Sequence, residues 1–203
     1  MVPRLGVLIS GRGSNLQAII DAISDGRLRA EIAVVISNVA DAQGLARAEA
    51  AGIATRVIPH RGHASRSAYD ALLVEALHES RVDLICLAGF MRLLGPTFIA
   101  AFPQRVLNIH PSLLPAFPGL DAQQQAFAHG VTVAGATVHF VSAELDAGPI
   151  VMQRAVAVQD DDTPETLAAR ILEVEHSLYP EAIALVLDGK WRLDGRRFLR
   201  NRP

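Results

Sequence analysis

The sequence predicts an α/β protein with an open, mostly parallel, twisted sheet and helices on both of its faces. In the first half of the chain, continuous apolar runs of strand length alternate with segments whose apolar residues recur at helical spacing. The runs lack polar alternation, which is typical of strands covered on both faces. Strands that alternate with helices pair in parallel through right-handed crossovers. The chain is then expected to end in a C-terminal hairpin.

Glycines and prolines divide the first half into its elements. The apolar run at residues 5–9 is the first expected strand, and the spacing from Leu16 to Ile23 places one apolar stripe along a helix that closes at Gly26. The other elements expected before residue 105 are strands at 32–36, 55–58 and 82–88 and helices at 42–51, at 67–79 and between Pro96 and Pro103.

The pattern changes in the second half. Thr163 and Pro164 supply a hydroxyl N-cap and a proline at the first helical position, and Pro180 should kink or restart the helix that they begin. We expect one domain over residues 1–203, with two lobes that meet near residue 100. The other expected elements are a strand that ends near residue 110, a helix at 120–128, strands at 136–141 and 150–158, and a hairpin at 191–198 with an Asp-Gly turn.

The composition is that of an ordinary globular protein. The chain has 203 residues, of which 50% are hydrophobic and 20% charged, and its net charge of −2 argues against a nucleic-acid partner, which needs a basic face. The single cysteine, Cys86, lies in an apolar run and is interpreted as a core residue. The apolar run at residues 5–9 is too short for a signal peptide or a membrane span, so we expect a cytoplasmic protein without membrane contact.

The segment Asn-Ile-His-Pro-Ser-Leu-Leu-Pro at residues 108–115 carries the first candidate chemistry. Strand periodicity places Asn108 and His110 on the same face of a strand end, which the following prolines terminate. A carboxamide can donate a hydrogen bond to a developing oxyanion, and an imidazole can carry a proton near neutral pH. Taken alone, a structural role for this pair is the commoner outcome.

The Gly-rich loop at residues 10–15 follows a strand and opens a helix. Backbone N–H groups and the helix dipole converge at such a point, so the loop is a candidate phosphate site. It lacks the Gly-Lys-Ser/Thr of a Walker A motif and is not a full dinucleotide fingerprint. The alternative is an ordinary turn in which Ser14 or Asn15 caps the helix.

For the other polar residues, a structural role is the default interpretation on local pattern alone. Asp146 lies in a loop between two strands, where a carboxylate could orient an imidazole, although a solvated loop residue is the default. His60 and His63 are interpreted as solvated rather than as a metal pair, because no third ligand is near. His139 is interpreted as a structural histidine within a strand, and Glu175 as part of a solvated helix face.

Six segments along the chain carry these residues in a fixed order. They are Ile-Ser-Gly-Arg-Gly-Ser-Asn-Leu (9–16), Leu-Ala-Gly-Phe-Met-Arg-Leu-Leu (87–94), Asn-Ile-His-Pro-Ser-Leu-Leu-Pro (108–115), Val-His-Phe-Val (138–141), Leu-Asp-Ala-Gly-Pro-Ile (145–150) and Glu-His-Ser-Leu-Tyr-Pro (175–180). Together they resemble the glycinamide ribonucleotide formyltransferases (phosphoribosylglycinamide formyltransferases), which use 10-formyltetrahydrofolate in purine synthesis. The resemblance covers nearly the whole chain and implies a Rossmann-like formyltransferase fold.

The resemblance implies functions for particular residues and for the two halves of the chain. Residues 1–100 would be a phosphate-binding half, and residues 101–203 a folate-binding and catalytic half, with a cis peptide bond at Leu114–Pro115. The catalytic trio would be Asn108, His110 and Asp146. The substrate phosphate and ribose would meet Gly13, Ser14, Asn15 and Glu175. The folate would meet Arg66, Met91, Arg92, Leu93, Leu94, Asn108 and Val141.

The implied reaction transfers a formyl group from 10-formyltetrahydrofolate, a co-substrate, to glycinamide ribonucleotide, with no metal. The expected partners are these small molecules, and the expected assembly is a monomer or weak homodimer. Some relatives have His-Thr-His where this chain has Asp121-Ala122-Gln123, so no role is assigned to that segment.

Three other functions agree with parts of the sequence. A formyltetrahydrofolate hydrolase usually carries an N-terminal regulatory domain, whereas the expected catalytic fold begins here at Leu5. A methionyl-tRNA formyltransferase would need a further C-terminal RNA-binding domain and a basic surface. A non-catalytic ligand-binding module would explain the Gly-rich loop but not the joint occurrence of Asn108, His110 and Asp146.

Overall fold

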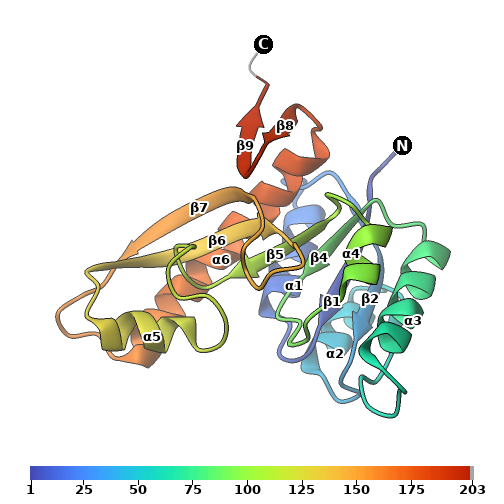
Figure 1. The fold of residues 1–203 in the computed structure, drawn as a ribbon, viewed down its shortest axis with the longest axis horizontal. Coiled ribbons are helices and arrows are strands. Elements are labelled where there is room, and N and C mark those ends of the chain that lie inside the picture. Colours follow the sequence, from blue (N-terminus) through green and yellow to red (C-terminus); the bar gives the residue numbers. More distant parts are fainter. Residues whose placement is uncertain (202–203) are drawn as a thin grey trace. The chain divides into compact units, whose positions relative to one another are not determined.

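A computed structural model describes residues 1–201 and divides the chain into two compact units (Figure 1). The first unit is Met1–Asn108, and the second begins at Ile109. The division falls inside strand β5 (Val106–His110). Our expectation of one domain with lobes that meet near residue 100 stays a prediction, and residues 202–203 lie outside the described part.

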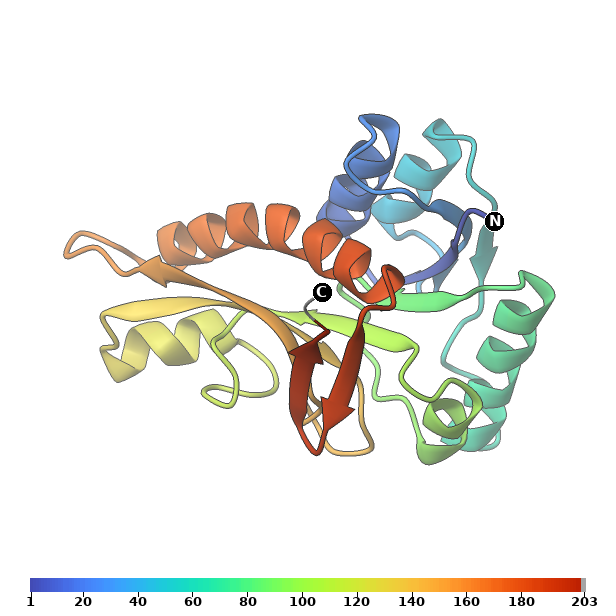
Figure 2. The same ribbon diagram turned by 90° about the horizontal axis from the view of Figure 1, so that it is seen from above.

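The first unit is a parallel sheet in the order β3-β2-β1-β4-β5, as the alternation of strands and helices predicted. Figure 2 shows α1 and α2 on one side of these strands and α3 and α4 on the other. Leu5, Val7, Leu8 and Ile9 of the central strand β1 are fully buried, which explains their unbroken apolar run. The elements are β1 (Arg4–Ile9), α1 (Ser14–Ser24), β2 (Glu31–Ser37), α2 (Gln43–Ala50), β3 (Thr55–Val57), α3 (Arg66–Glu79), β4 (Leu84–Leu87), α4 (Pro96–Ala101) and β5.

The second unit orders its strands β6-β7-β9-β8. The β6–β7 and β8–β9 pairs are antiparallel, and β7 meets β9 in parallel. Helix α6 packs along β6 and β7. The expected terminal hairpin is present, with Asp194 as the last residue of β8 and Gly195 beginning the turn. The elements are α5 (Ala122–His129), β6 (Val133–Phe140), β7 (Ile150–Ala157), α6 (Pro164–Leu187), β8 (Trp191–Asp194) and β9 (Arg197–Arg200).

Helix α6 contains Pro180 in its interior. Thr163 caps it through a reciprocal pair of hydrogen bonds with Thr166, as the N-cap pattern predicted. We predicted a kink or a restart at Pro180, but the helix does not restart, because α6 continues unbroken to Leu187 (Figure 2). The neighbours Leu178, Tyr179 and Ala182 are fully buried, so packing of this face offsets the backbone hydrogen bond that a proline cannot donate.

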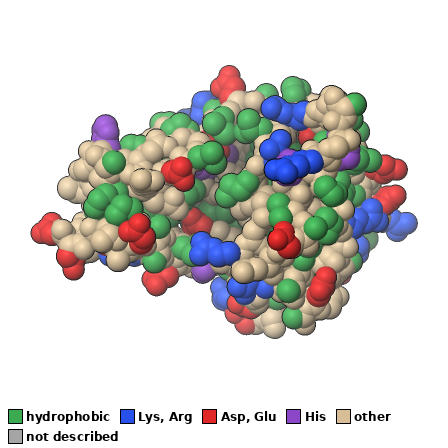
Figure 3. Space-filling view, turned by 90° about the horizontal axis from the view of Figure 1, so that it is seen from below, with side chains coloured by type: hydrophobic (Ala, Val, Ile, Leu, Met, Phe, Trp, Pro, Cys, Tyr) green, Lys and Arg blue, Asp and Glu red, His purple; other side chains and the backbone are tan. Residues whose placement is uncertain are grey.

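The surface of the chain mixes its charges. On the face drawn in Figure 3, Lys and Arg side chains are interspersed with Asp and Glu, as the near-neutral net charge leads one to expect. Among residues 1–201, no helix is both long and apolar enough to cross a membrane.

Position 13 requires glycine because of its left-handed backbone conformation and because the backbone of Gly44 lies close to it. Gly13 adopts the left-handed conformation, with φ of 71°, directly before α1. A Cβ atom there would lie 2.6 Å from the Cα atom of Gly44 at the start of α2. The Gly44 amide in turn donates to the Gly11 carbonyl at 3.0 Å, so the loop and α2 pack backbone against backbone. Substitution of Gly13 would therefore disturb the packing of this loop against α2.

A pair of alanine variants tests this packing. Gly13→Ala should lower the free energy of unfolding by at least about 2 kcal/mol, from left-handed strain and the contact with Gly44. Gly11→Ala should change it by less than about 0.5 kcal/mol, because a Cβ at Gly11 meets nothing within 4 Å. Urea unfolding monitored by circular dichroism measures both, and equal losses would contradict the account.

Candidate active site

Asn108 and His110 lie two residues apart on β5, so both project from the same face of the strand. His110 is 5% exposed, and its Nε2 lies 2.9 Å from the Phe117 carbonyl oxygen. A carbonyl only accepts, so Nε2 carries the proton in this contact. The structure thus confirms the expected strand end and fixes one tautomeric position of the ring.

The turn that follows His110 is held by its own hydrogen bonds. Thr137 on β6 donates to the Ser112 carbonyl at 2.7 Å and accepts from the Leu114 amide at 3.0 Å. Ser112 donates its hydroxyl to the Ala116 carbonyl at 2.6 Å. The expected cis peptide bond at Leu114–Pro115 is present. This network fixes the path of the chain from β5 to Phe117.

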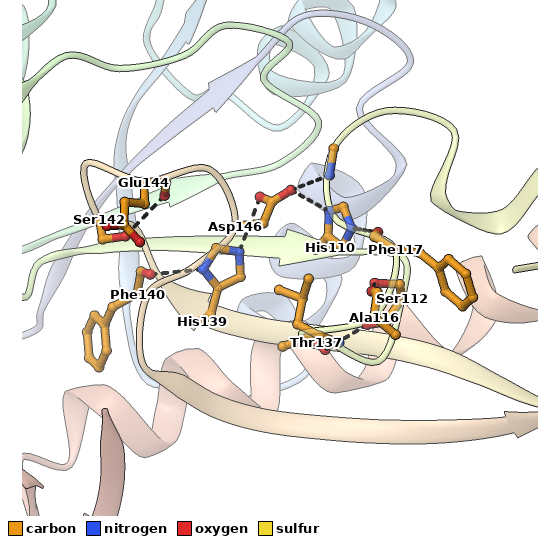
Figure 4. A network of polar contacts seen from close by, with 12 residues as sticks. His110, Ser112, Ala116, Phe117, Thr137, His139, Phe140, Ser142, Glu144 and Asp146 are labelled. Atoms are coloured by element: carbon orange, nitrogen blue, oxygen red, sulfur yellow. Dashed lines mark hydrogen bonds and ion pairs between the residues drawn. The ribbon is translucent and has the colours of Figure 1, made fainter. Parts of the chain in front are cut away.

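The Asp146 carboxylate lies against His110, within the second unit (Figure 4). Asp146 Oδ2 is 3.4 Å from His110 Nδ1 and accepts the Gly119 amide at 2.8 Å. The Asp146 side chain is 11% exposed, so the default interpretation of a solvated loop residue is wrong. Both ring nitrogens of His110 therefore face acceptors.

His139 is a buried strand histidine, as expected, but the sequence did not predict that it lies next to Asp146. It lies near the end of β6, is 2% exposed, and places Nε2 at 3.7 Å from Asp146 Oδ1. Its Nδ1 donates to the Phe140 carbonyl at 2.9 Å. The β6–β7 register shifts between Val138 and His139, and such irregularities redirect side chains. We interpreted His139 as structural because strand periodicity carries no information on which loop folds back over it.

Burial governs the protonation of His139. It lowers the pKa of the imidazole below the ordinary value of 6.5, and outweighs the Phe140 carbonyl and the Asp146 carboxylate, which raise it. The neutral ring keeps its proton on Nδ1, because the Phe140 carbonyl accepts there. A second proton on Nε2 would point toward Asp146 Oδ1.

The Gly-rich loop of the first unit has the form of an anion site. The helix α1 has Gly13 as its N-cap, with no side-chain capping bond, so the alternative in which Ser14 or Asn15 caps the helix is wrong. The first amides of a helix have no intrahelical partner and are available to a ligand. Arg47 donates from Nε to the Arg12 carbonyl at 2.9 Å, which fixes the loop from the side of α2.

The segment at residues 91–94 is tied to this loop within the first unit. The Ser10 hydroxyl donates to Asn38 Oδ1 at 2.5 Å and accepts the Met91 amide at 2.8 Å. Asn38 also meets His60 Nδ1 at 3.1 Å, so His60 is not simply solvated. Met91, Arg92 and Leu93 are exposed, whereas Leu94 is buried.

Arg66, the first residue of α3, lies near the end of the same segment. Its Cδ atom is 3.7 Å from the position that a Cβ at Gly95 would take. The Gly95 amide donates to Asp70 Oδ2 at 2.7 Å, and burial raises the pKa of the Asp70 carboxyl. The structure therefore places Arg66 next to Gly95, and the expected folate site stays a prediction. Val141, half-buried, directly follows β6 in the second unit.

The interpretation of Glu175 as part of a solvated helix face is wrong. The residue is 5% exposed. The reason is helical geometry: Ile171, Leu178 and Tyr179 lie four residues before it and three and four after it, and all three are fully buried.

Among residues 1–201, no group of three acidic, histidine or cysteine side chains is placed to hold a metal ion.

Comparison with known proteins assigns the family. The profile described as formyl transferase matches residues 3–183. This chain belongs to the formyl transferase family. It is 45% identical to the phosphoribosylglycinamide formyltransferase of Escherichia coli, over 94% of this chain and 93% of that protein. The crystal structure of glycinamide ribonucleotide transformylase 1 from Symbiobacterium toebii is 55% identical, with a TM-score of 0.96 over 98% of this chain and 94% of that one.

The chain also matches part of a larger relative. It is 50% identical to the trifunctional purine biosynthetic protein adenosine-3 of Bos taurus over 94% of its own length. It spans about a fifth (19%) of that relative. Family membership confirms the resemblance that the six sequence segments indicated.

The buried His139 predicts a pH dependence of stability. A histidine whose pKa is lowered by folding binds its proton more readily when unfolded, so its contribution is complete above about pH 6.5 and is lost as the pH falls through the lowered folded value. His139→Gln, which cannot titrate, should therefore flatten the loss of stability on the acidic side. Urea unfolding between about pH 5 and pH 8 measures this. The exposed His78→Gln is the control, and identical slopes for wild type and His139→Gln would refute the assignment.

Proposed function

We propose that this chain transfers the formyl group of 10-formyltetrahydrofolate to the amine of glycinamide ribonucleotide, giving formylglycinamide ribonucleotide and tetrahydrofolate in cytoplasmic purine biosynthesis. The observation that carries the proposal is the contact between His110 and Asp146 beside Asn108 on β5, in a member of the formyl transferase family. The formyl group is already activated on the folate, so acid–base chemistry and oxyanion stabilisation are sufficient.

The reaction begins when the substrate amine attacks the formyl carbon. The formyl oxygen takes up negative charge in the tetrahedral intermediate, and Asn108 and the Nε2–H group of His110 donate hydrogen bonds to it. Each such donor is worth about 3–4 kcal/mol. The Phe117 carbonyl, which accepts from His110 Nε2 at 2.9 Å, marks the direction in which a substrate oxygen would replace it as acceptor.

Asp146 then supports the proton transfers. Its Oδ2 lies 3.4 Å from His110 Nδ1, so the carboxylate holds the orientation of the ring. The amine must lose a proton and the folate N10 must gain one before the C–N10 bond breaks. Asp146 and His110 provide a base and an acid for these two steps, directly or through water.

Each unit contains residues for which we propose a substrate contact. In the first unit, Gly13, Ser14 and Asn15 would bind the phosphate through backbone amides at the start of α1. Glu175 of α6 would accept hydrogen bonds from the ribose hydroxyls. The folate would meet Arg66, Met91, Arg92, Leu93, Leu94, Asn108 and Val141.

Two variants test the catalytic pair. His110→Ala and Asp146→Asn should each lower kcat by about 10²–10³-fold. The first removes a hydrogen-bond donor to the oxyanion, and the second removes a carboxylate that supports proton transfer. Asn suits the left-handed conformation of Asp146, whose φ is 48°, so the loop should fold as before. Glu144→Gln, an exposed position in the same loop, is the control and should keep full activity. A kcat for Asp146→Asn equal to that of wild type would exclude the proposed role.

The acceptor assay tests the function itself. Consumption of 10-formyltetrahydrofolate should depend on glycinamide ribonucleotide, and formylglycinamide ribonucleotide should appear in equal amount. The amine without its phosphate should react with a much higher KM, because remote binding energy positions the nucleophile. A hydrolase would release tetrahydrofolate at the same rate without the acceptor, and a ligand-binding module would turn over neither substrate. Either result would overturn the proposal.

A further inference from the structure

The C-terminal hairpin places two aromatic rings against the end of β6. The Trp191 ring is 5.2 Å from that of Phe140 and 5.2 Å from that of Phe198, which itself lies 6.3 Å from Phe140. Trp191 Nε1 donates to the Val186 carbonyl at 2.9 Å, so the hairpin is also fixed to the end of α6. These three rings form a cluster within the second unit, which we call the hairpin cluster.

Phe140 links this cluster to the loop that carries Asp146. It is 2% exposed, and its amide donates to the Pro149 carbonyl at 2.9 Å, which closes the base of the loop at residues 141–149. Gly148 packs on the same residue, since a Cβ there would lie 1.8 Å from the Phe140 carbonyl oxygen. Both ends of the loop therefore meet at Phe140.

The Phe140 backbone also contacts the polar network. Its carbonyl accepts from His139 Nδ1, and Figure 4 shows its ring pointing away from Asp146 while its carbonyl faces His139. Residues 143–145 are exposed, so the tip of the loop has little packing of its own. At the base of the loop, the hairpin continues the sheet, because Arg197 of β9 pairs with Ile150, the first residue of β7.

We propose that Trp191 and Phe198 are positioning residues for formyl transfer. They hold Phe140 in place, and through it the loop that sets the distance from Asp146 to His110. The inference rests on the proposed function for its catalytic consequence. Neither aromatic residue touches the reacting atoms, so its loss should act on turnover rather than on recognition of the phosphate.

Kinetics separate this role from a general loss of structure. In Trp191→Ala, kcat should fall by about 10–100-fold, the scale expected for a misplacement near 1 Å, while KM for glycinamide ribonucleotide changes by less than about threefold. Trp191→Phe keeps an aromatic ring on Phe140 and should recover kcat to within about threefold of wild type. Arg192→Ala, the exposed neighbour on the same strand, is the matched control. Unchanged kcat in Trp191→Ala, or no recovery in Trp191→Phe, would overturn the proposal.

Amide hydrogen exchange provides a test that needs no activity. The Phe140 amide, bonded to Pro149, should exchange at least about tenfold faster in the milder Phe198→Leu variant than in Arg192→Ala, because the base of the loop opens more often. This variant keeps an apolar side chain and covers the case in which Trp191→Ala fails to fold. Equal exchange at Phe140 would refute the inference. Failure of the wild type to transfer a formyl group would refute only the proposed function.

Discussion

The site depends on the contacts of the Asp146 carboxylate. Its Oδ2 contacts His110 Nδ1 and accepts a hydrogen bond from the Gly119 amide, and its Oδ1 faces His139 Nε2. A nearly buried charge is tolerated only when it has such partners. Together with the Phe117 carbonyl, which accepts from His110 Nε2, the carboxylate at Nδ1 fixes the orientation of the imidazole ring. The strand end, the turn after it and the loop at residues 141–149 all serve to keep this geometry.

Most of the fold could be predicted because its signals are local. Apolar runs, helical stripes and terminating glycines gave the order of elements and the parallel sheet, which the structure confirms. At Pro180 the local rule left a kink and a restart open, and α6 does not restart there. The burial of neighbouring helix residues, which a rule about proline does not contain, offsets the missing hydrogen bond.

The site was harder to predict because it depends on pairings between distant segments. Asn108 and His110 share a strand, so their common face followed from periodicity, whereas His139 met Asp146 only through a register shift and a folded loop. Glu175 was misjudged because its position on the buried stripe was not weighed against its charge. Gly13 was predicted to bind a phosphate. Its close approach to Gly44 is a packing constraint between two distant segments, so a local sequence pattern could not predict it.

The central claim is that His110 and Asp146 act as one unit. A double-mutant cycle on kcat/KM, comparing wild type, His110→Ala, Asp146→Asn and the double variant, tests it most directly. If the carboxylate works only through the imidazole, the double variant should be no more than about threefold slower than the slower single variant. If kcat/KM of the double variant instead falls by the product of the two single-variant factors, the two residues act independently. That result would contradict the account.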